Sequence, residues 1–386
     1  MRRMNFRQYN NVTSITIPNS VTVTQPISVF MGMQNLVTAT LPNRVRSLER
    51  SYFGCSNFAG PPTCGNYVTD MNYAYGSCRN MKGSPVCGPK VTRMTNAYIA
   101  CSNITGDAAC GPNVTNMYQA YIDCTNLSGN AACGNRVVDM SYSYMNCSGL
   151  AGSAACGPNV INMIFAYNNC TNLTGSPVCG DNVTNMQYAY SNCTNLTGSA
   201  ACGPNVVDMS YAYDGCTNLN GTPACGDNVT NMQWAYYECT NLTGSAACGP
   251  NVVDMSYAYD GCKSLTRPFV SKSVKNATWA FGNCEFEQYY VNINQLPTVY
   301  TGMFAGSNVV PCIVSSDTDK AISIAKKLFD NDHIVYRGPI DAEKYPGAMT
   351  LDLLGDDVAL IFPNQTVYDG YKVSQSEELF VDLFEE

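Results

Sequence analysis

The cysteines are the residues of this chain whose type and spacing could do chemistry. They fall into two columns, and a shorter gap, as from Cys55 to Cys64, alternates with a longer one, as from Cys64 to Cys78. The first column ends at Cys262 and the second at Cys248. Structural zinc sites use closely spaced cysteine pairs or histidines, whereas both gaps here are long and the only histidine is His333. We therefore expect no metal site.

Two interpretations of the thiols are open. A small thiol fits a tightly packed interior layer, so free core cysteines are the first expectation. Disulfides between neighbouring layers are the alternative, because strands about 4.8 Å apart fall within the Cα separation that a disulfide can bridge.

No other motif points to catalysis. The chain lacks a glycine-rich phosphate loop, a zinc-protease helix motif and a nucleophile elbow. A recurring Asp/Asn column supplies one or two carboxylates per repeat, fewer than the roughly six to eight oxygens that calcium takes. His333 has no partner motif, and we interpret it as a surface or packing residue. The sequence predicts no catalytic residue, no cofactor and no enzyme.

The cysteine columns belong to a strict repeat, whose period is the separation of Cys101 from Cys124. The stretch TNLTGSAACGPNVVDMSYAYDGC occupies positions 194–216 and recurs unchanged at 240–262, with a looser copy between them. A fixed period of this order is typical of a solenoid, in which each repeat contributes one layer, or rung, to a continuous core.

Within a rung, we expect the leucine (such as Leu173) to point inward and the following glycine to permit a bend. The Ser-Ala-Ala-Cys segment is predicted to be a short strand, and Gly-Pro-Asn a turn. The Val, Met and Ala-Tyr positions are expected to return inward through an irregular or short helical segment. A tyrosine column from Tyr52 to Tyr259 is predicted to lie in the core.

The chain divides by pattern into six regions. A capping helix is expected over 316–332, with Ser316 or Asp317 as its N-cap, and a hairpin of 358–364 with 368–373. The predicted regions are a basic arm (1–13), irregular capping repeats (14–49), regular repeats (50–265), degenerate repeats (266–315), the capping helix and a strand (316–337), and an acidic tail (338–386).

The charges exclude some classes of partner. The net charge is −8, and no Lys or Arg occurs between Arg136 and Lys263, so we expect no nucleic-acid binding. The N-terminus has no apolar run typical of a signal peptide, and no stretch is long enough to span a bilayer, so no membrane insertion is expected. In the Asp/Asn column, aspartates such as Asp208 and Asp254 alternate with asparagines, which keeps like charges apart.

Two sets of residues are candidates for contacts with partners. An aromatic column two residues before the core tyrosines varies to Thr95, Gln119 and Phe165, which indicates a partly exposed face suited to recognising protein or glycan, or a contact in a lattice. Its members are Tyr73, Tyr142, Tyr188, Tyr211, Trp234 and Tyr257. The terminal extensions carry candidate docking residues, which are Arg2, Arg3, Arg7, Leu379, Phe380, Leu383 and Phe384.

The repeat resembles a known family. Its Ala-Tyr-x-x-Cys-x-x-Leu string is similar to the signature of the BspA-type leucine-rich repeat, and Ile17–Val21 (Ile-Pro-Asn-Ser-Val) matches that family's strand-to-turn segment. The resemblance covers about residues 14–315 and implies a right-handed leucine-rich-repeat solenoid with short parallel strands. This chain departs from the family in having small residues, Cys and Met where the family has isoleucines, so we expect a slimmer core.

The resemblance also implies a function, because members of the family are mostly surface, adhesive or phage-encoded proteins. We expect a non-enzymatic structural and interaction protein, built into a bacteriophage virion as a decoration, fibre or neck component and assembled in the host cytoplasm. Its partners would be other particle proteins or its own copies, with a host surface protein or glycan as a further contact. The alternative is a bacterial cell-surface adhesin that binds a host protein or glycan.

Overall fold

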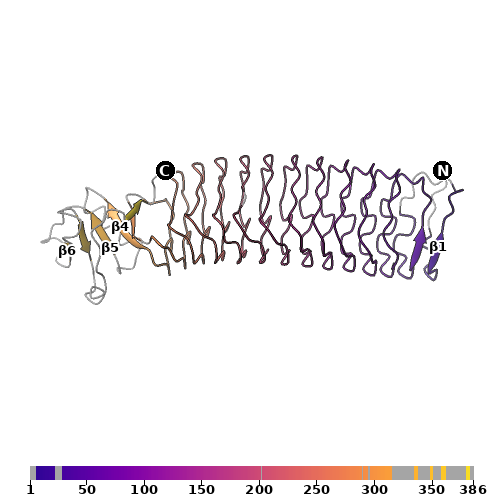
Figure 1. Cartoon of the computed structure of the whole chain (residues 1–386), viewed down its shortest axis with the longest axis horizontal. Coiled ribbons are helices and arrows are strands. Elements are labelled where there is room, and N and C mark those ends of the chain that lie inside the picture. Colours follow the sequence, from indigo (N-terminus) through magenta and orange to yellow (C-terminus); the bar gives the residue numbers. More distant parts are fainter. Residues whose placement is uncertain are drawn as a thin grey trace. The chain divides into compact units, whose positions relative to one another are not determined.

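The computed structural model describes residues 6–21, 28–200, 202–288, 290–293 and 296–314, together with four short strands nearer the C-terminus. It divides into two compact units, residues 1–219 and 220–386, each described by itself. Within each unit the chain winds in stacked turns (Figure 1). The predicted helix over 316–332 and His333 lie outside the described residues, as does 368–373.

The first unit opens with two parallel strands, β1 (Ser14–Thr16) and β2 (Thr38–Thr40), in the register Ser14↔Thr38. Each later rung joins the next through an isolated parallel bridge in the Asp/Asn column, such as Asn116↔Asp139. The short strand predicted at the Ser-Ala-Ala-Cys segment is not formed, as at 153–156. The parallel contacts between rungs lie in the following segment, so the prediction misplaced them.

That following segment is a series of tight turns, where the sequence left an irregular or short helical segment open. Its amides bond to the next rung at every second residue: the N–H groups of Met117, Gln119, Tyr121 and Asp123 donate to the rung ahead at 2.8–3.0 Å. Gln119 and Asp123 adopt positive φ angles of 57° and 61°. A left-handed residue costs roughly 1–2 kcal/mol, and the closely spaced inter-rung hydrogen bonds, each worth about 0.5–1.5 kcal/mol net, offset this.

The core tyrosine column is the centre of each rung, as predicted. In the first unit, the rings of Tyr98, Tyr121 and Tyr144 are fully buried and stack with centroids 5.3 and 5.4 Å apart. The Tyr121 hydroxyl accepts a hydrogen bond from the Ala109 N–H (3.0 Å) and donates one to the Ala109 carbonyl (2.6 Å). The side chain thus satisfies backbone groups that a strand would have paired with a neighbouring rung, which explains why the Ser-Ala-Ala-Cys type of segment is not a strand.

The two cysteine columns have different surroundings. A first-column thiol such as Cys124 is fully buried and donates to the carbonyl of Tyr98 in the previous rung, with Sγ and O 3.0 Å apart. A second-column sulfur such as Cys133 is half-buried and accepts the N–H of Gly157 in the next rung at 3.1 Å. Both columns are free thiols throughout the described residues, which agrees with the first of the two interpretations.

The glycine after each second-column cysteine sets how closely rungs approach. A Cβ on Gly157 would lie 2.7 Å from the carbonyl oxygen of Gly134, whereas one on Gly65 would lie 3.2 Å from that of Asn43. We expect Gly157→Ala to lower the free energy of unfolding by about 2–3 kcal/mol, because backbone must move, and Gly65→Ala to lower it much less. Urea denaturation of both variants tests this, and equal losses would contradict it.

The second unit contains rungs of the same kind. The bridge Asp254↔Asn276 spans one position fewer than the bridge Asn231↔Asp254 before it, so this rung is one residue shorter. Tyr236 and Tyr259 stack in its core at 5.2 Å, and Phe281 continues the stack 5.7 Å from Tyr259.

The second unit also holds a six-stranded sheet in the order β6-β7-β5-β4-β3-β8. Its strands are β3 (Tyr290–Ile293), β4 (Val310–Val314), β5 (Ile334–Arg337), β6 (Ala348–Thr350), β7 (Val358–Ile361) and β8 (Phe380–Asp382). The predicted hairpin placed 358–364 against 368–373, and that pairing is wrong: the strand at 358–361 forms as β7, but its two antiparallel partners are β5 and β6. The tail strand β8 pairs in parallel with β3, in the register Tyr290↔Phe380.

Candidate interaction face

The outer aromatic column occupies a position that the turn geometry pushes out of the core. In the rung of Tyr142, Met140 and Tyr144 are buried while Tyr142 between them is half-buried and adopts a φ of 58°. Its N–H donates to the carbonyl of Ile164 in the next rung at 2.8 Å. The left-handed backbone conformation therefore turns this side chain away from the core without breaking the inter-rung ladder.

The preceding Asp/Asn residue anchors this turn. The carboxylate of Asp139 accepts the Ser141 N–H at 3.0 Å, and the amide oxygen of Asn162 accepts the Ile164 N–H at 3.1 Å. Asp and Asn favour such local side-chain turns. Neighbouring rungs also bond to each other, since the Asn116 side-chain amide lies 3.4 Å from the Asp139 carboxylate. At Asp139, as at Asp254, a neighbouring asparagine thus places an amide donor beside the carboxylate.

The exposed rings form a stack in the first unit. Tyr142, Phe165, Tyr188 and Tyr211 follow one another at centroid distances of 5.0, 4.3 and 4.3 Å, with ring planes within 11° of parallel. Neighbouring rings therefore cover both faces of Phe165 and Tyr188, and their edges remain at the surface. Burial, followed by the charge and hydrogen bond of Tyr211, raises the pKa of Tyr188 to about 12, so its hydroxyl stays protonated at neutral pH.

The six predicted aromatic residues are not all together. Tyr73 is separated from the stack by Asn96 and Gln119, and the Arg50 guanidinium lies over its ring, 5.2 Å from the centroid. The member of this column assigned as Thr95 is wrong, because the left-handed position in that rung is Asn96, with a φ of 55°. The sequence period was sufficient to show this.

In the second unit, Trp234 and Tyr257 stack at 4.2 Å and Trp279 follows 6.4 Å from Tyr257. Trp279 is a further member of this column that the repeat period does not reveal, because its rung is one residue shorter and falls out of register. A Cβ on Gly302, in the next rung, would lie 2.5 Å from the indole nitrogen of Trp279. The indole is thus packed against the backbone there.

The predicted docking residues are placed only in part. Arg2, Arg3, Leu379, Leu383 and Phe384 lie outside the described residues. Arg7 is exposed, and Phe380 begins β8. The pairing of β8 with β3 gives this segment of the tail a partner within the chain.

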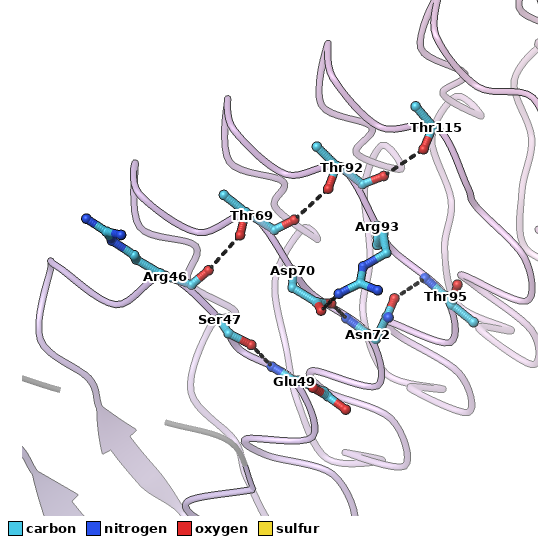
Figure 2. A network of polar contacts seen from close by, with 10 residues as sticks. All are labelled: Arg46, Ser47, Glu49, Thr69, Asp70, Asn72, Thr92, Arg93, Thr95 and Thr115. Atoms are coloured by element: carbon cyan, nitrogen blue, oxygen red, sulfur yellow. Dashed lines mark hydrogen bonds and ion pairs between the residues drawn. The ribbon is translucent and has the colours of Figure 1, made fainter. Parts of the chain in front are cut away.

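A polar network occupies the Asp/Asn face of the early rungs (Figure 2). The Arg93 guanidinium pairs with the Asp70 carboxylate, whose other oxygen accepts the Asn72 N–H at 2.9 Å. Arg93 stands where most rungs have Asp or Asn, and the ion pair with Asp70 holds it in the column. The network is therefore structural, and none of its residues is arranged as an acid–base pair.

The thiols are not arranged as nucleophiles. Burial raises the pKa of Cys101 to about 12 and that of Cys110 to about 11, whereas a reactive cysteine needs a lowered pKa. In the part of the chain that the structure describes, no group of three or more His, Cys, Asp or Glu side chains is placed to hold a metal ion. In the same part, no helix has the length and apolar character needed to cross a membrane.

Stacked rungs with a leucine column, an inter-rung hydrogen-bond ladder and single parallel bridges define a leucine-rich-repeat solenoid. Leu127, Leu150 and Leu173 are fully buried in successive rungs. The family model described as the BspA type leucine rich repeat region matches six copies, over residues 2–128, 209–310 and 234–335. These matches cover more than half of the chain, and the chain belongs to that family.

Two solved structures are similar to this chain. A leucine-rich repeat protein from Bacteroides ovatus matches with a TM-score of 0.53 and 15% identity, over 80% of this chain and 85% of that chain. A leucine rich cell surface protein from Faecalibacterium prausnitzii matches with a TM-score of 0.41 and 14% identity, over 81% of this chain and 90% of that one. No curated protein matches. The first likeness supports the fold.

Proposed function

We propose that this chain is a non-enzymatic interaction protein of a bacterial cell surface, and that it contacts a host protein through the outer aromatic column. Membership of the BspA-type family supports an interaction role without catalysis, since its members are mostly surface, adhesive or phage-encoded proteins. The observation that carries the proposal is the row of partly exposed aromatic side chains held by a rigid backbone. Rigid aromatic side chains are the residues that contribute most at protein interfaces.

The ring geometry favours a protein over a glycan as the partner. Binding a sugar against an aromatic side chain requires an uncovered ring face, and neighbouring rings cover the faces of Phe165 and Tyr188. The ring edges remain to make contacts, and the edges of a row of tyrosine and phenylalanine rings suit the mixed apolar and hydrogen-bonding surface of a protein.

A virion component was the first expectation from the sequence, with the cell-surface adhesin as its alternative, and neither the structure nor the comparisons add an observation in favour of the virion. Surface labelling of intact cells distinguishes a cell-surface protein from a virion component. Intact producing cells treated with a membrane-impermeant lysine label should yield labelled protein under the cell-surface proposal. Labelling only after lysis, with the protein recovered in phage particles, would overturn that proposal and support the virion.

The binding face can be tested with Tyr188→Asn combined with Tyr211→Asn. Asparagine suits this site, because Asn96 occupies the same column at a φ of 55°. The double variant should bind host cells at least tenfold more weakly, with unchanged circular dichroism. Protease treatment of the host cells should abolish binding by the parent protein, and glycosidase treatment should not. A matched variant, Tyr73→Asn, removes a ring outside the stack and should bind normally. Unchanged binding by the double variant would overturn the assignment of this face.

A further inference from the structure

A row of exposed cations follows the turn that precedes the Asp/Asn column in the early rungs of the first unit. We call it the basic edge, and its members are Arg44, Arg46, Lys90, Arg93 and Arg136. Arg44, Lys90 and Arg136 share one column of the repeat and lie two rungs apart, as the second residue of the turn in each rung. The position between Arg44 and Lys90 is Tyr67.

Most other rungs have asparagine in this column, and its side chain holds the stack together. The side-chain amides of Asn113, Asn159 and Asn182 each donate to a turn carbonyl of the rung before, at 2.8, 2.7 and 2.8 Å. Asn205 and Asn251 do the same at 2.9 Å. Each bond adds a modest net stabilisation, so packing of the rungs favours asparagine at this position.

Arginine or lysine at this position gives up the asparagine bond. Among the residues described, no ion pair involves Arg44, Lys90 or Arg136, and Lys90 lies 5.2 Å from the ring centroid of Tyr67. The three cations are therefore not explained by the stacking of the rungs. Positions where a chain departs from its own structural rule are typical of functional sites.

The early rungs carry an excess of positive charge in a chain whose net charge is −8. From Arg44 to Arg136 there are eight lysine and arginine residues against four aspartate and glutamate residues. Of these acids, Asp70 is already paired with Arg93. Asp181 is the first acid in the turns themselves and comes two rungs beyond the last cation of the basic edge. The edge therefore suits an anionic partner that extends over about five rungs.

The spacing of the cations indicates the conformation of that partner. Rungs joined by parallel pairing lie about 4.8 Å apart, so Arg44, Lys90 and Arg136 follow one another at roughly 9.6 Å. A polyproline II helix has three residues per turn and a rise of about 3.1 Å, so every third side chain returns to one face after about 9.3 Å. In a β-strand the same face returns after about 6.6 Å, which would leave the third carboxylate about 6 Å short.

The exposed tyrosine favours proline between the acidic residues of the partner. Tyr67 is 51% exposed and lies one rung from both Arg44 and Lys90. Aromatic side chains are the usual docking surface for proline-rich segments in the polyproline II conformation, and clusters of arginine bind acidic motifs. The basic edge combines both features in one line along the stack.

We propose that the basic edge binds an acidic, proline-rich peptide segment of a partner protein in the polyproline II conformation, with a carboxylate at every third residue. Successive carboxylates pair with Arg44, Lys90 and Arg136, and a proline ring packs against Tyr67. This contact goes beyond the proposed host contact and does not depend on it, because the basic edge and the outer aromatic column are different sets of residues.

Fluorescence anisotropy of a labelled peptide with five Glu-Pro-Pro repeats, titrated with the full-length chain, tests the proposal. We expect binding at low salt that weakens as salt rises. A peptide of the same composition with its five glutamates in one block has the same charge but the wrong spacing, and it should bind at least about fivefold more weakly.

Replacing the three cations by the asparagine of the other rungs separates binding from stability. The combined variant Arg44→Asn, Lys90→Asn and Arg136→Asn should bind the repeat peptide at least about tenfold more weakly. Its urea midpoint should be unchanged or higher, because asparagine can form the bond to the preceding turn. Arg79→Asn is the matched control, since it removes an exposed cation outside the basic edge, and it should bind like the parent.

Several results would overturn the proposal. A parent protein that does not bind the repeat peptide at low salt, or that binds the block peptide equally well, would exclude this ligand. Unchanged binding by the triple variant would place the contact elsewhere. A triple variant with a lower urea midpoint would show that the cations serve the stack. Tighter binding of a sulfated oligosaccharide than of the repeat peptide would assign the basic edge to a glycan.

Discussion

Raising the pH above about 9 should lower the free energy of unfolding of the repeats steeply. Burial raises the pKa of Cys101 and Cys193 from the usual 9.0 to about 12, and that of Cys64 and Cys110 to about 11. The folded state therefore keeps the thiol proton where the unfolded chain has released it. The stabilisation is complete below about pH 9 and is lost as the pH rises through the folded values.

The size of the effect follows from the number of such thiols. Each loses about 1.4 kcal/mol of stabilisation per pH unit between its unfolded and folded pKa. For Cys64, Cys101, Cys110 and Cys193 together, the loss reaches about 10 kcal/mol over two pH units, which is comparable to the about 5–15 kcal/mol by which a domain is stable. Burial raises the pKa of core tyrosines such as Tyr121 and Tyr167 in the same direction, which adds to the loss above about pH 10.

Urea unfolding followed by circular dichroism between about pH 7 and 11, with a reductant present, measures this slope. Replacing Cys101 and Cys193 together by alanine should lower stability at neutral pH but make the alkaline slope shallower, since two titrating groups are gone. A parent protein whose stability is flat up to about pH 11, or a variant with an unchanged slope, would contradict the role of the thiols.

Tyr121→Phe should lower the free energy of unfolding by about 1–3 kcal/mol. The change leaves the ring stack intact but removes both hydrogen bonds to Ala109, whose N–H and carbonyl then lose their partner. Tyr121→Ala also removes a ring stacked between Tyr98 and Tyr144, so its loss should reach about 3–5 kcal/mol.

Tyr52→Phe provides the control within the same column. The Tyr52 hydroxyl is buried and has no hydrogen-bond partner among the described residues, so its removal should leave stability unchanged or raise it by up to about 1 kcal/mol. Urea denaturation midpoints of the three variants make the comparison. Equal losses for Tyr52→Phe and Tyr121→Phe would show that the bonds to Ala109 contribute nothing specific.

The sequence by itself determined the repeat and its interior. Leu, Met, Tyr and first-column Cys recur once in each repeat, and the buried positions such as Leu173, Met163 and Tyr167 follow those columns. A strict period is sufficient because each rung meets only its neighbours, so a residue type that packs in one rung packs in the next. The alternation of Asp with Asn in successive repeats was visible in the sequence for the same reason.

Tertiary structure decided which backbone segment carries the contacts between rungs. The Ser-Ala-Ala-Cys segment looked like the strand, but the hydroxyl of a tyrosine further along the chain, as Tyr121 is from Ala109, takes its backbone groups. No local pattern shows such a bond. The turn segment instead holds residues such as Gln119 at positive φ, a conformation that glutamine does not favour and that the stacked ladder imposes.

For the outer aromatic column too, the sequence shows one part of the arrangement and the tertiary structure the other. Periodicity showed that Tyr142, Tyr188 and Tyr211 share a column, but only the three-dimensional stack shows that the ring faces are covered and the edges exposed. Sequence periodicity identifies which residues are equivalent, whereas contacts between rungs decide which of their atoms remain for a partner.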